Sequence, residues 1–159
     1  GEFGHVVLDE RGTPCACGRR GCWEQFASNQ AAVRHYLGRN APKRNSGRRA
    51  GRSLQFTDIL ALADGGDRRA VATLERMAYY LGLGISGLVT GLAPQLLVIV
   101  GEVTAAWSRV GPIIIETVSS RTLPGTSTAI VPTDAGTQPR LRGAVTLVVQ
   151  QHFGAPSVA

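Results

Sequence analysis

The sequence contains no long apolar segment. No uninterrupted apolar run reaches the roughly 18 residues that a membrane-spanning helix needs. The first residues also lack the basic stretch and apolar core of a secretory signal peptide. We therefore expect a cytoplasmic protein that makes no contact with a membrane.

The sequence is also poor in features of fibrous, disordered or disulfide-stabilised chains. Its 8 Pro and 20 Gly are scattered, and 43% hydrophobic against 18% charged residues excludes global disorder. A chain of 159 residues can bury roughly 70% of its unfolded surface, so the 3 Cys are not needed as disulfides. This length fits one domain, or one lobe of a larger protein. Because the chain begins at Gly1 without Met, we expect it to be a fragment or a processed chain.

One stretch, residues 39–52, contains no acidic residue and accounts for the entire net positive charge of the chain. The formal net charge is +6, and residues 39–52 hold Lys43 and five Arg, which leaves 11 basic and 11 acidic residues elsewhere. Pro42, Gly47 and Gly51 in this stretch favour a flexible, solvated loop. Clustered Arg could instead contact nucleic-acid phosphates or a partner, although no aromatic residue is interleaved for base stacking.

The rest of the sequence alternates between strand-like and helix-like segments, which predicts α/β architecture. We expect strands near residues 3–8, 96–100 and 128–131, and the apolar run at 96–100 is typical of a strand buried on both faces. We expect helices at 23–37, 57–63, 68–92, 105–117 and 138–153, with Asp67 as the N-cap of the longest. Close approach of a neighbouring backbone would explain the four Gly in that helix, which are Gly82, Gly84, Gly87 and Gly91.

All three cysteines lie within eight residues, at Cys15, Cys17 and Cys22. Cys15 and Cys17 are too close for an ordinary disulfide framework, and clustered Cys in a cytoplasmic chain favour a metal. A tetrahedral zinc takes four thiolate or imidazole ligands, and His5 is the candidate for the fourth. With four protein ligands this zinc would be structural. The alternatives are three buried small hydrophobic residues or a redox-labile loop.

Two motifs resemble signatures of the ROK family, named for repressors, open reading frames and sugar kinases. Glu2-Phe3-Gly4-His5 matches the pattern Glu-x-Gly-His. The segment from Cys15 to Glu24 matches Cys-x-Cys-Gly-x-x-Gly-Cys-x-Glu at every fixed position. Residues 92–101 and 141–144 resemble two later family segments, so the resemblance covers nearly the whole chain apart from the loop at 39–52.

The resemblance implies an actin-like, ribonuclease H-like ATPase fold of two lobes around a cleft. Residues 1–159 would form the C-terminal lobe as a single domain, without the N-terminal lobe or any winged helix. It implies zinc binding by His5, Cys15, Cys17 and Cys22, and binding of sugar hydroxyls by Glu2, His5 and Glu24. A carboxylate can accept two such hydrogen bonds. Alternatively, Glu24 is a helix first-turn acid that interacts with the helix dipole, and Glu2 is a solvated terminal residue.

The family's catalytic motifs are absent. Neither an Asp-x-Gly-x-Thr phosphate loop at the expected spacing nor an Asn-Asp motif occurs in the chain, so we expect no catalysis by these residues alone. Glu102 stands where ROK kinases have a second Gly near the nucleotide, and a carboxylate there disfavours phosphate binding. The residues therefore favour a sugar-sensing transcriptional regulator that binds operator DNA through a missing N-terminal domain and forms dimers or tetramers. The main alternative is the C-terminal lobe of an ATP-dependent, glucokinase-like sugar kinase, and a further one is a purely structural or degenerate ROK lobe.

Overall fold

The structure, a computed structural model, describes residues 2–38, 53–125, 127–134 and 145–147. The predicted loop at 39–52 lies outside the described residues. So does most of the predicted helix at 138–153, of which residues 145–147 are described and helical. None of the helices within these ranges is long and apolar enough to cross a membrane.

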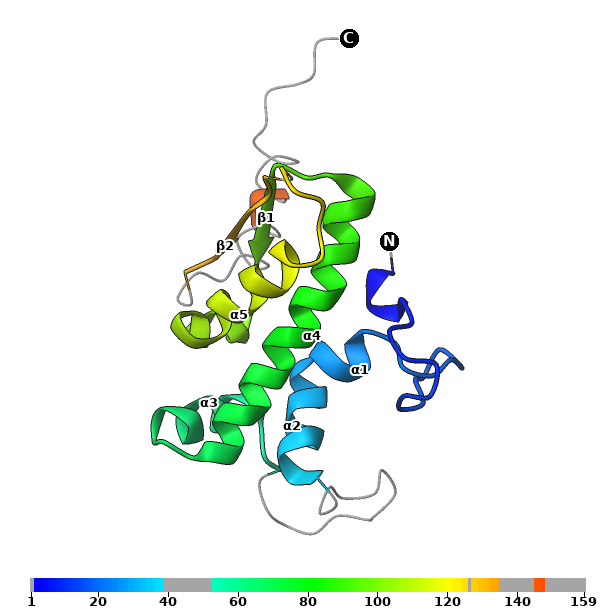
Figure 1. The fold of residues 1–159 in the computed structure, drawn as a ribbon. Coiled ribbons are helices and arrows are strands. Elements are labelled where there is room, and N and C mark those ends of the chain that lie inside the picture. The colour runs from blue at the N-terminus through cyan, green and yellow to red at the C-terminus, as the bar shows by residue number, and fades with distance from the viewer. Residues whose placement is uncertain (1, 39–52, 126, 135–144, 148–159) are drawn as a thin grey trace.

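The fold is organised around one long helix, α4 (Arg68–Leu92). Asp67 is its N-cap, as predicted, because its carboxylate accepts a hydrogen bond from the backbone N–H of Ala70 at 2.8 Å. The buried face of α4 includes Leu74, Ile85 and Val89, in the predicted three-to-four spacing. Figure 1 shows α4 between two groups of elements, with the N-terminal segment on one side and α5 and the strands on the other.

The side of α4 that faces α5 contains a β-α-β unit. Strand β1 (Leu96–Ile99) leads through the 3-10 helix η3 (Glu102–Ala106) into α5 (Trp107–Ser119), and the chain returns as β2 (Ala129–Pro132). The strands pair in parallel, with Leu96 opposite Ala129. Parallel strands need a crossover connection of this kind, and here α5 forms it and packs on α4. The predicted α/β alternation is therefore present in this half of the chain.

The prediction that the apolar run at 96–100 is buried on both faces is wrong for the described residues. Leu97 packs against the core and Ile99 is buried in it, whereas Leu96 is 55% exposed and Val98 is 47% exposed. The physical reason is that side chains of a strand alternate between two faces, and among the described residues only the face of Leu97 and Ile99 packs against the helical core.

Two further differences lie at the N-terminal end. Residues 3–8 do not form a strand: Phe3–His5 is a 3-10 helix, η1, and Val7 makes only an isolated bridge to Cys22. The predicted helix at 23–37 is divided into α1 (Glu24–Ala27) and α2 (Asn29–Leu37). Ser28 divides them because its backbone is extended and its hydroxyl caps the N–H of Ala31 at 3.2 Å. The predicted helix at 57–63 is confirmed as α3 (Phe56–Asp64).

Two of the four glycines in α4 allow a close approach, as predicted, although side chains as well as backbone make it. A Cβ at Gly82 would meet Thr117 of α5 at 2.6 Å, and a Cβ at Gly84 would overlap the Trp23 indole. Trp23 precedes α1 and donates a hydrogen bond from Nε1 to the Tyr80 carbonyl at 2.8 Å. Gly87 and Gly91 face open space. Gly84 therefore provides the surface on which Trp23 joins the N-terminal segment to α4.

Replacing Gly84 by Ala should destabilise the protein, because the added methyl group displaces the Trp23 indole. We expect a loss of about 1–3 kcal/mol in the free energy of unfolding, as for other overpacked sites. Gly87→Ala is the matched control in the same helix, and we expect it to stabilise by up to about 1 kcal/mol. Urea denaturation of both variants measures the difference. Equal changes in the two variants would contradict the packing role assigned to Gly84.

Candidate metal centre and adjoining cleft

Two backbone hydrogen bonds position the first residues beside the cysteine segment. In η1 the N–H of His5 donates to the carbonyl of Glu2 at 3.0 Å, which curls the chain and places His5 at its end. The chain then runs back along the cysteine segment, where the N–H of Trp23 donates to the carbonyl of Val6 at 2.8 Å. This antiparallel contact brings a histidine beside cysteines that lie 10 to 17 residues later in the sequence.

The cysteine segment is a tight loop with almost no apolar core. Its described residues before Trp23 include only three buried ones, Cys15, Gly21 and Cys22. Gly21 has a positive φ of 63°, and a Cβ there would overlap the Asp9 carbonyl, so only Gly fits. The loop is closed by backbone hydrogen bonds such as that from the N–H of Cys15 to the carbonyl of Arg19 at 2.8 Å. Cys15 and Cys22 thus occupy the buried positions that apolar side chains take in a larger fold, whereas Cys17 is exposed.

The structure brings all four predicted metal ligands together. The ligand atoms of His5, Cys15, Cys17 and Cys22 lie within 4.8 Å of one another. Cys15 Sγ lies 3.5 Å from His5 Nδ1, and Cys17 Sγ lies 3.5 Å from Cys22 Sγ. A zinc ion with Zn–S distances of about 2.3 Å has ligand atoms about 3.8 Å apart in a tetrahedron. The spacing and the donor set therefore fit a tetrahedral zinc ion.

The thiols differ in their electrostatic environment. Burial, followed by hydrogen bonds with the other two thiols, raises the pKa of Cys22 to about 12. The pKa of Cys17, which is exposed, is lowered chiefly by a hydrogen bond from the backbone N–H of Arg19. Cys22 therefore keeps its proton at neutral pH unless a cation takes the place of that proton.

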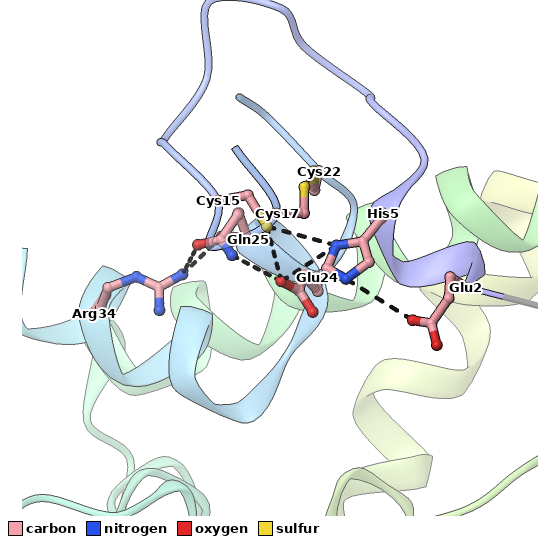
Figure 2. Close-up of polar contacts among 8 residues, drawn as sticks. All are labelled: Glu2, His5, Cys15, Cys17, Cys22, Glu24, Gln25 and Arg34. Carbon is pink, nitrogen blue, oxygen red and sulfur yellow. Dashed lines mark hydrogen bonds and ion pairs between the residues drawn. The ribbon is translucent and has the colours of Figure 1, made fainter. Parts of the chain in front are cut away.

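The three residues predicted to bind sugar hydroxyls adjoin this cluster (Figure 2). Glu24 Oε1 lies 3.7 Å from His5 Nδ1 and accepts a hydrogen bond from the Cys15 thiol at 3.1 Å. On the other side of the ring, His5 Nε2 lies 3.9 Å from a carboxylate oxygen of Glu2. The Cys15 hydrogen bond is the main reason why the pKa of Glu24 is lowered. His5 thus stands between two carboxylates, with one ring nitrogen directed to each.

Glu24 also lines a large cleft of about 1210 Å³ between α1, α2, α4 and the carboxyl end of β1. Gly101 ends β1 with a positive φ of 115°, and Glu102 follows it as the first residue of η3. The Glu102 carboxylate accepts a hydrogen bond from the side-chain amide of Asn29, the first residue of α2. A carboxylate therefore occupies the strand end where α/β proteins place ligand loops.

Sequence reasoning missed the polar side chains that support Glu24. Gln25 donates to Glu24 Oε1 at 3.1 Å, and Arg34 in turn donates to the Gln25 side chain at 3.0 Å. Asn29 was missed as well. In a continuous helix at 23–37 it would be an interior residue, whereas in the structure it is the first residue of α2 and lines the cleft. The signal that could have revealed it is Ser28, a preferred N-cap residue in the middle of the predicted helix.

The fold and the site define a class of protein. The structure is similar to a ROK family glucokinase from Streptomyces griseus, solved with glucose and AMPPNP, with TM-score 0.74 and 30% identity over 92% of this chain and 50% of that one. It is also similar to a ROK family transcriptional regulator, a homologue of the E. coli MLC protein, with TM-score 0.71 and 29% identity over 83% of this chain and 34% of that one. The mixed α/β fold is thus shared with both sugar kinases and regulators.

The sequence comparison identifies the family. The ROK family model matches residues 1–151, and the chain belongs to the ROK family. It is 29% identical to the xylose repressor of Bacillus spizizenii over 96% of this chain and 37% of that protein. It is 34% identical to a glucokinase of Halalkalibacterium halodurans over 67% of this chain and 34% of that protein. The chain therefore spans about a third of the length of these relatives.

Proposed function

We propose that residues 1–159 are the C-terminal lobe of an actin-like, ribonuclease H-like fold and the sugar-sensing body of a ROK transcriptional regulator. The observation that carries this proposal is the convergence of Glu2, His5 and Glu24 beside the cysteine cluster. Two carboxylates on either side of an imidazole form a row of acceptors that suits adjacent hydroxyls of a hexose or a hexose derivative. A neutral, hydroxyl-rich ligand also suits a site whose carboxylates would repel an anion.

In this proposal His5, Cys15, Cys17 and Cys22 hold a structural zinc ion. The ion would supply the cross-link that the loop lacks, and it would fix which ring nitrogen of His5 carries the proton. His5 Nδ1 lies on the cysteine side and Nε2 on the side of Glu2. His5 can therefore face the metal with one nitrogen and hydrogen-bond a sugar hydroxyl with the other. The chain beyond Cys22 continues directly into Glu24, so the same loop positions that carboxylate.

The regulator function is favoured over catalysis by Glu102. Its carboxylate projects at the end of β1 and hydrogen-bonds Asn29 across the cleft that Glu24 also lines. A negative charge at this position opposes nucleotide phosphates, and its side chain obstructs close approach of a phosphate to the backbone. The similarity to the xylose repressor, which extends over 96% of the chain, agrees with this choice.

The alternative is the C-terminal lobe of an ATP-dependent sugar kinase. The similarity to the Halalkalibacterium halodurans glucokinase, at 34% identity, favours it. Both a sugar-sensing regulator and a sugar kinase would need the side chains that bind sugar, so the residues of this site do not discriminate between the two functions. The discriminating residue in this chain is Glu102, where ROK kinases usually have Gly. We propose that the full-length regulator is a cytoplasmic dimer or tetramer that binds operator DNA through an N-terminal domain.

The test uses the full-length protein and an operator selected from random duplex DNA. A regulator should bind that DNA with a steep dependence on salt concentration, release it when the inducing sugar is added, and show no turnover of ATP. The measurements are fluorescence anisotropy of labelled DNA and a coupled assay of sugar phosphorylation with a panel of hexoses. Phosphorylation of a hexose at enzymatic rates, without sequence-specific DNA binding, would establish the kinase alternative instead.

A further inference from the structure

A second cavity, of about 460 Å³, lies between the cysteine loop, α2 and α4 and next to the cleft that Glu24 lines. Its polar lining consists of side chains that donate hydrogen bonds or carry positive charge, namely Thr13, Gln25, Arg34, His35, Thr73 and Arg76. Within the described part of the chain, no Asp or Glu contributes to this lining. The first cavity differs in that its lining includes the carboxylates of Glu24, Glu102 and Asp134, together with Arg34, which lines both cavities.

The two arginines of the second cavity have no ion-pair partner within the described ranges. Arg34 is held by two hydrogen bonds to Gln25, one to its carbonyl at 3.2 Å and one to its side-chain oxygen at 3.0 Å. Arg76 stacks over the ring of Tyr80 at 5.6 Å. These contacts orient both guanidinium groups, and Arg34 acts on the Glu24 carboxylate at longer range, through the Gln25 side chain that lies between them. A guanidinium group has five N–H donors, so each arginine can still donate to a ligand.

His35 and Thr73 are further polar residues in the lining of the second cavity. His35 Nδ1 lies 3.2 Å from the hydroxyl of Thr73, which is itself buried. Burial, followed by the charges of Arg76 and Arg69, lowers the pKa of His35, so its imidazole is neutral at pH 7. The effect on His35 agrees with a positive potential from the arginines around the cavity, although Asp67 and Glu24 lie near Arg69 and Arg34 outside its lining.

We propose that this second cavity binds a phosphoryl group, either as free phosphate or as a phosphomonoester. Arginine side chains match the tetrahedral oxyanion through paired N–H donors, and hydroxyl groups such as that of Thr13 complete its coordination. The volume is in the range of small-molecule sites and exceeds that of a bare phosphate ion, so there is room for the organic part of an ester. A neutral sugar at the carboxylates and an anion at the arginines would therefore occupy neighbouring but distinct sites.

The test is calorimetric titration of the full-length protein, without sugar, with inorganic phosphate in one arm and glycerol 3-phosphate in the other. Ionic strength is kept constant with chloride. We expect saturable binding and a loss of about tenfold or more in affinity for Arg76→Gln, since hydrogen bonds to charged groups contribute about that factor. Tighter binding of glycerol 3-phosphate identifies an ester as the ligand class, and tighter binding of phosphate identifies the free ion.

The control is Arg109→Gln, which removes the same charge from an exposed position on α5 outside the cavity. We expect this variant to bind both probes as the wild type does. Equal weakening by the two substitutions would show nonspecific attraction by net charge and would overturn the proposal, as would the absence of saturable binding in both arms. Arg76 is exposed, so the thermal unfolding midpoint of Arg76→Gln should stay close to that of the wild type. Because no sugar is present, the result does not depend on the sugar-sensing function.

Discussion

Cys17→Ser should remove the bound metal and lower the melting temperature of the protein. The cysteine loop has Cys15, Gly21 and Cys22 as its buried residues, so little besides the metal would hold it folded. A metal present at 1,000 times its Kd contributes about 4.1 kcal/mol of stability. For a domain of this size that corresponds to roughly 8–16 °C in Tm. Elemental analysis should find about one zinc per wild-type chain and much less in the variant.

The matched control for this prediction is Ala16→Ser, which places the same serine in the same exposed loop between two ligands. We expect it to keep its zinc and its Tm. A chelator should lower the Tm of the wild type and of Ala16→Ser, and leave that of Cys17→Ser unchanged, since the last has no metal to lose. Metal-free wild-type protein with three titratable thiols and an unaltered Tm would show that the cluster is not a zinc site.

Glu24→Ala should weaken sugar binding without changing the zinc content. Glu24 lies at the junction of the metal cluster and the cleft, where its side chain is 39% exposed and its Oε1 lies 3.7 Å from His5 Nδ1. Loss of hydrogen bonds to a charged group costs about 1.5–3 kcal/mol. We therefore expect the Kd for sugar to rise roughly ten- to a hundredfold. Calorimetric titration of the full-length protein measures it, and elemental analysis checks the zinc.

The control for Glu24 is Glu75→Ala, which removes the same charge from an exposed position on α4. It should bind sugar as the wild type does. In a regulator, Glu24→Ala should still bind operator DNA but should no longer release it at the sugar concentrations that induce the wild type. If Glu24→Ala binds sugar with wild-type affinity, Glu24 serves only as a first-turn acid of α1, and the assignment of the sugar site is wrong.

The parts of the fold that were predicted correctly depend on short-range patterns. The periodicity of α4 and its cap at Asp67 could be read from residues within one or two turns of each other. The predicted ligand set could be read in the same way, because three thiols within eight residues limit the possible chemistry. Their spacing in the structure fits that reading, while the zinc ion and the sugar contacts remain proposals.

The errors arose where distant residues decide the local structure. Val6 and Val7 have strand-forming side chains, yet this segment pairs with the turn before Trp23 and joins no sheet in the part of the chain that the structure describes. Ser28 ends α1 because the chain must change direction there to pack α2 on α4. The exposed face of β1 could not be predicted either, since the length and composition of a strand do not reveal how many layers cover it.

The sequence by itself determined the family motifs, the candidate metal ligands and the helix that organises the fold, because each depends on residue types at fixed, short spacings. Only the tertiary structure decided that His5 stands between two carboxylates, that Asn29 meets Glu102 across a cleft, and that Arg34 and Arg76 share a cavity with no acidic side chain among its described lining residues. These pairs are separated by up to 73 positions, and their contact results from the packing of α1 and α2 against α4 and the end of β1. No local pattern encodes that packing, which depends on shape and burial summed over the whole core.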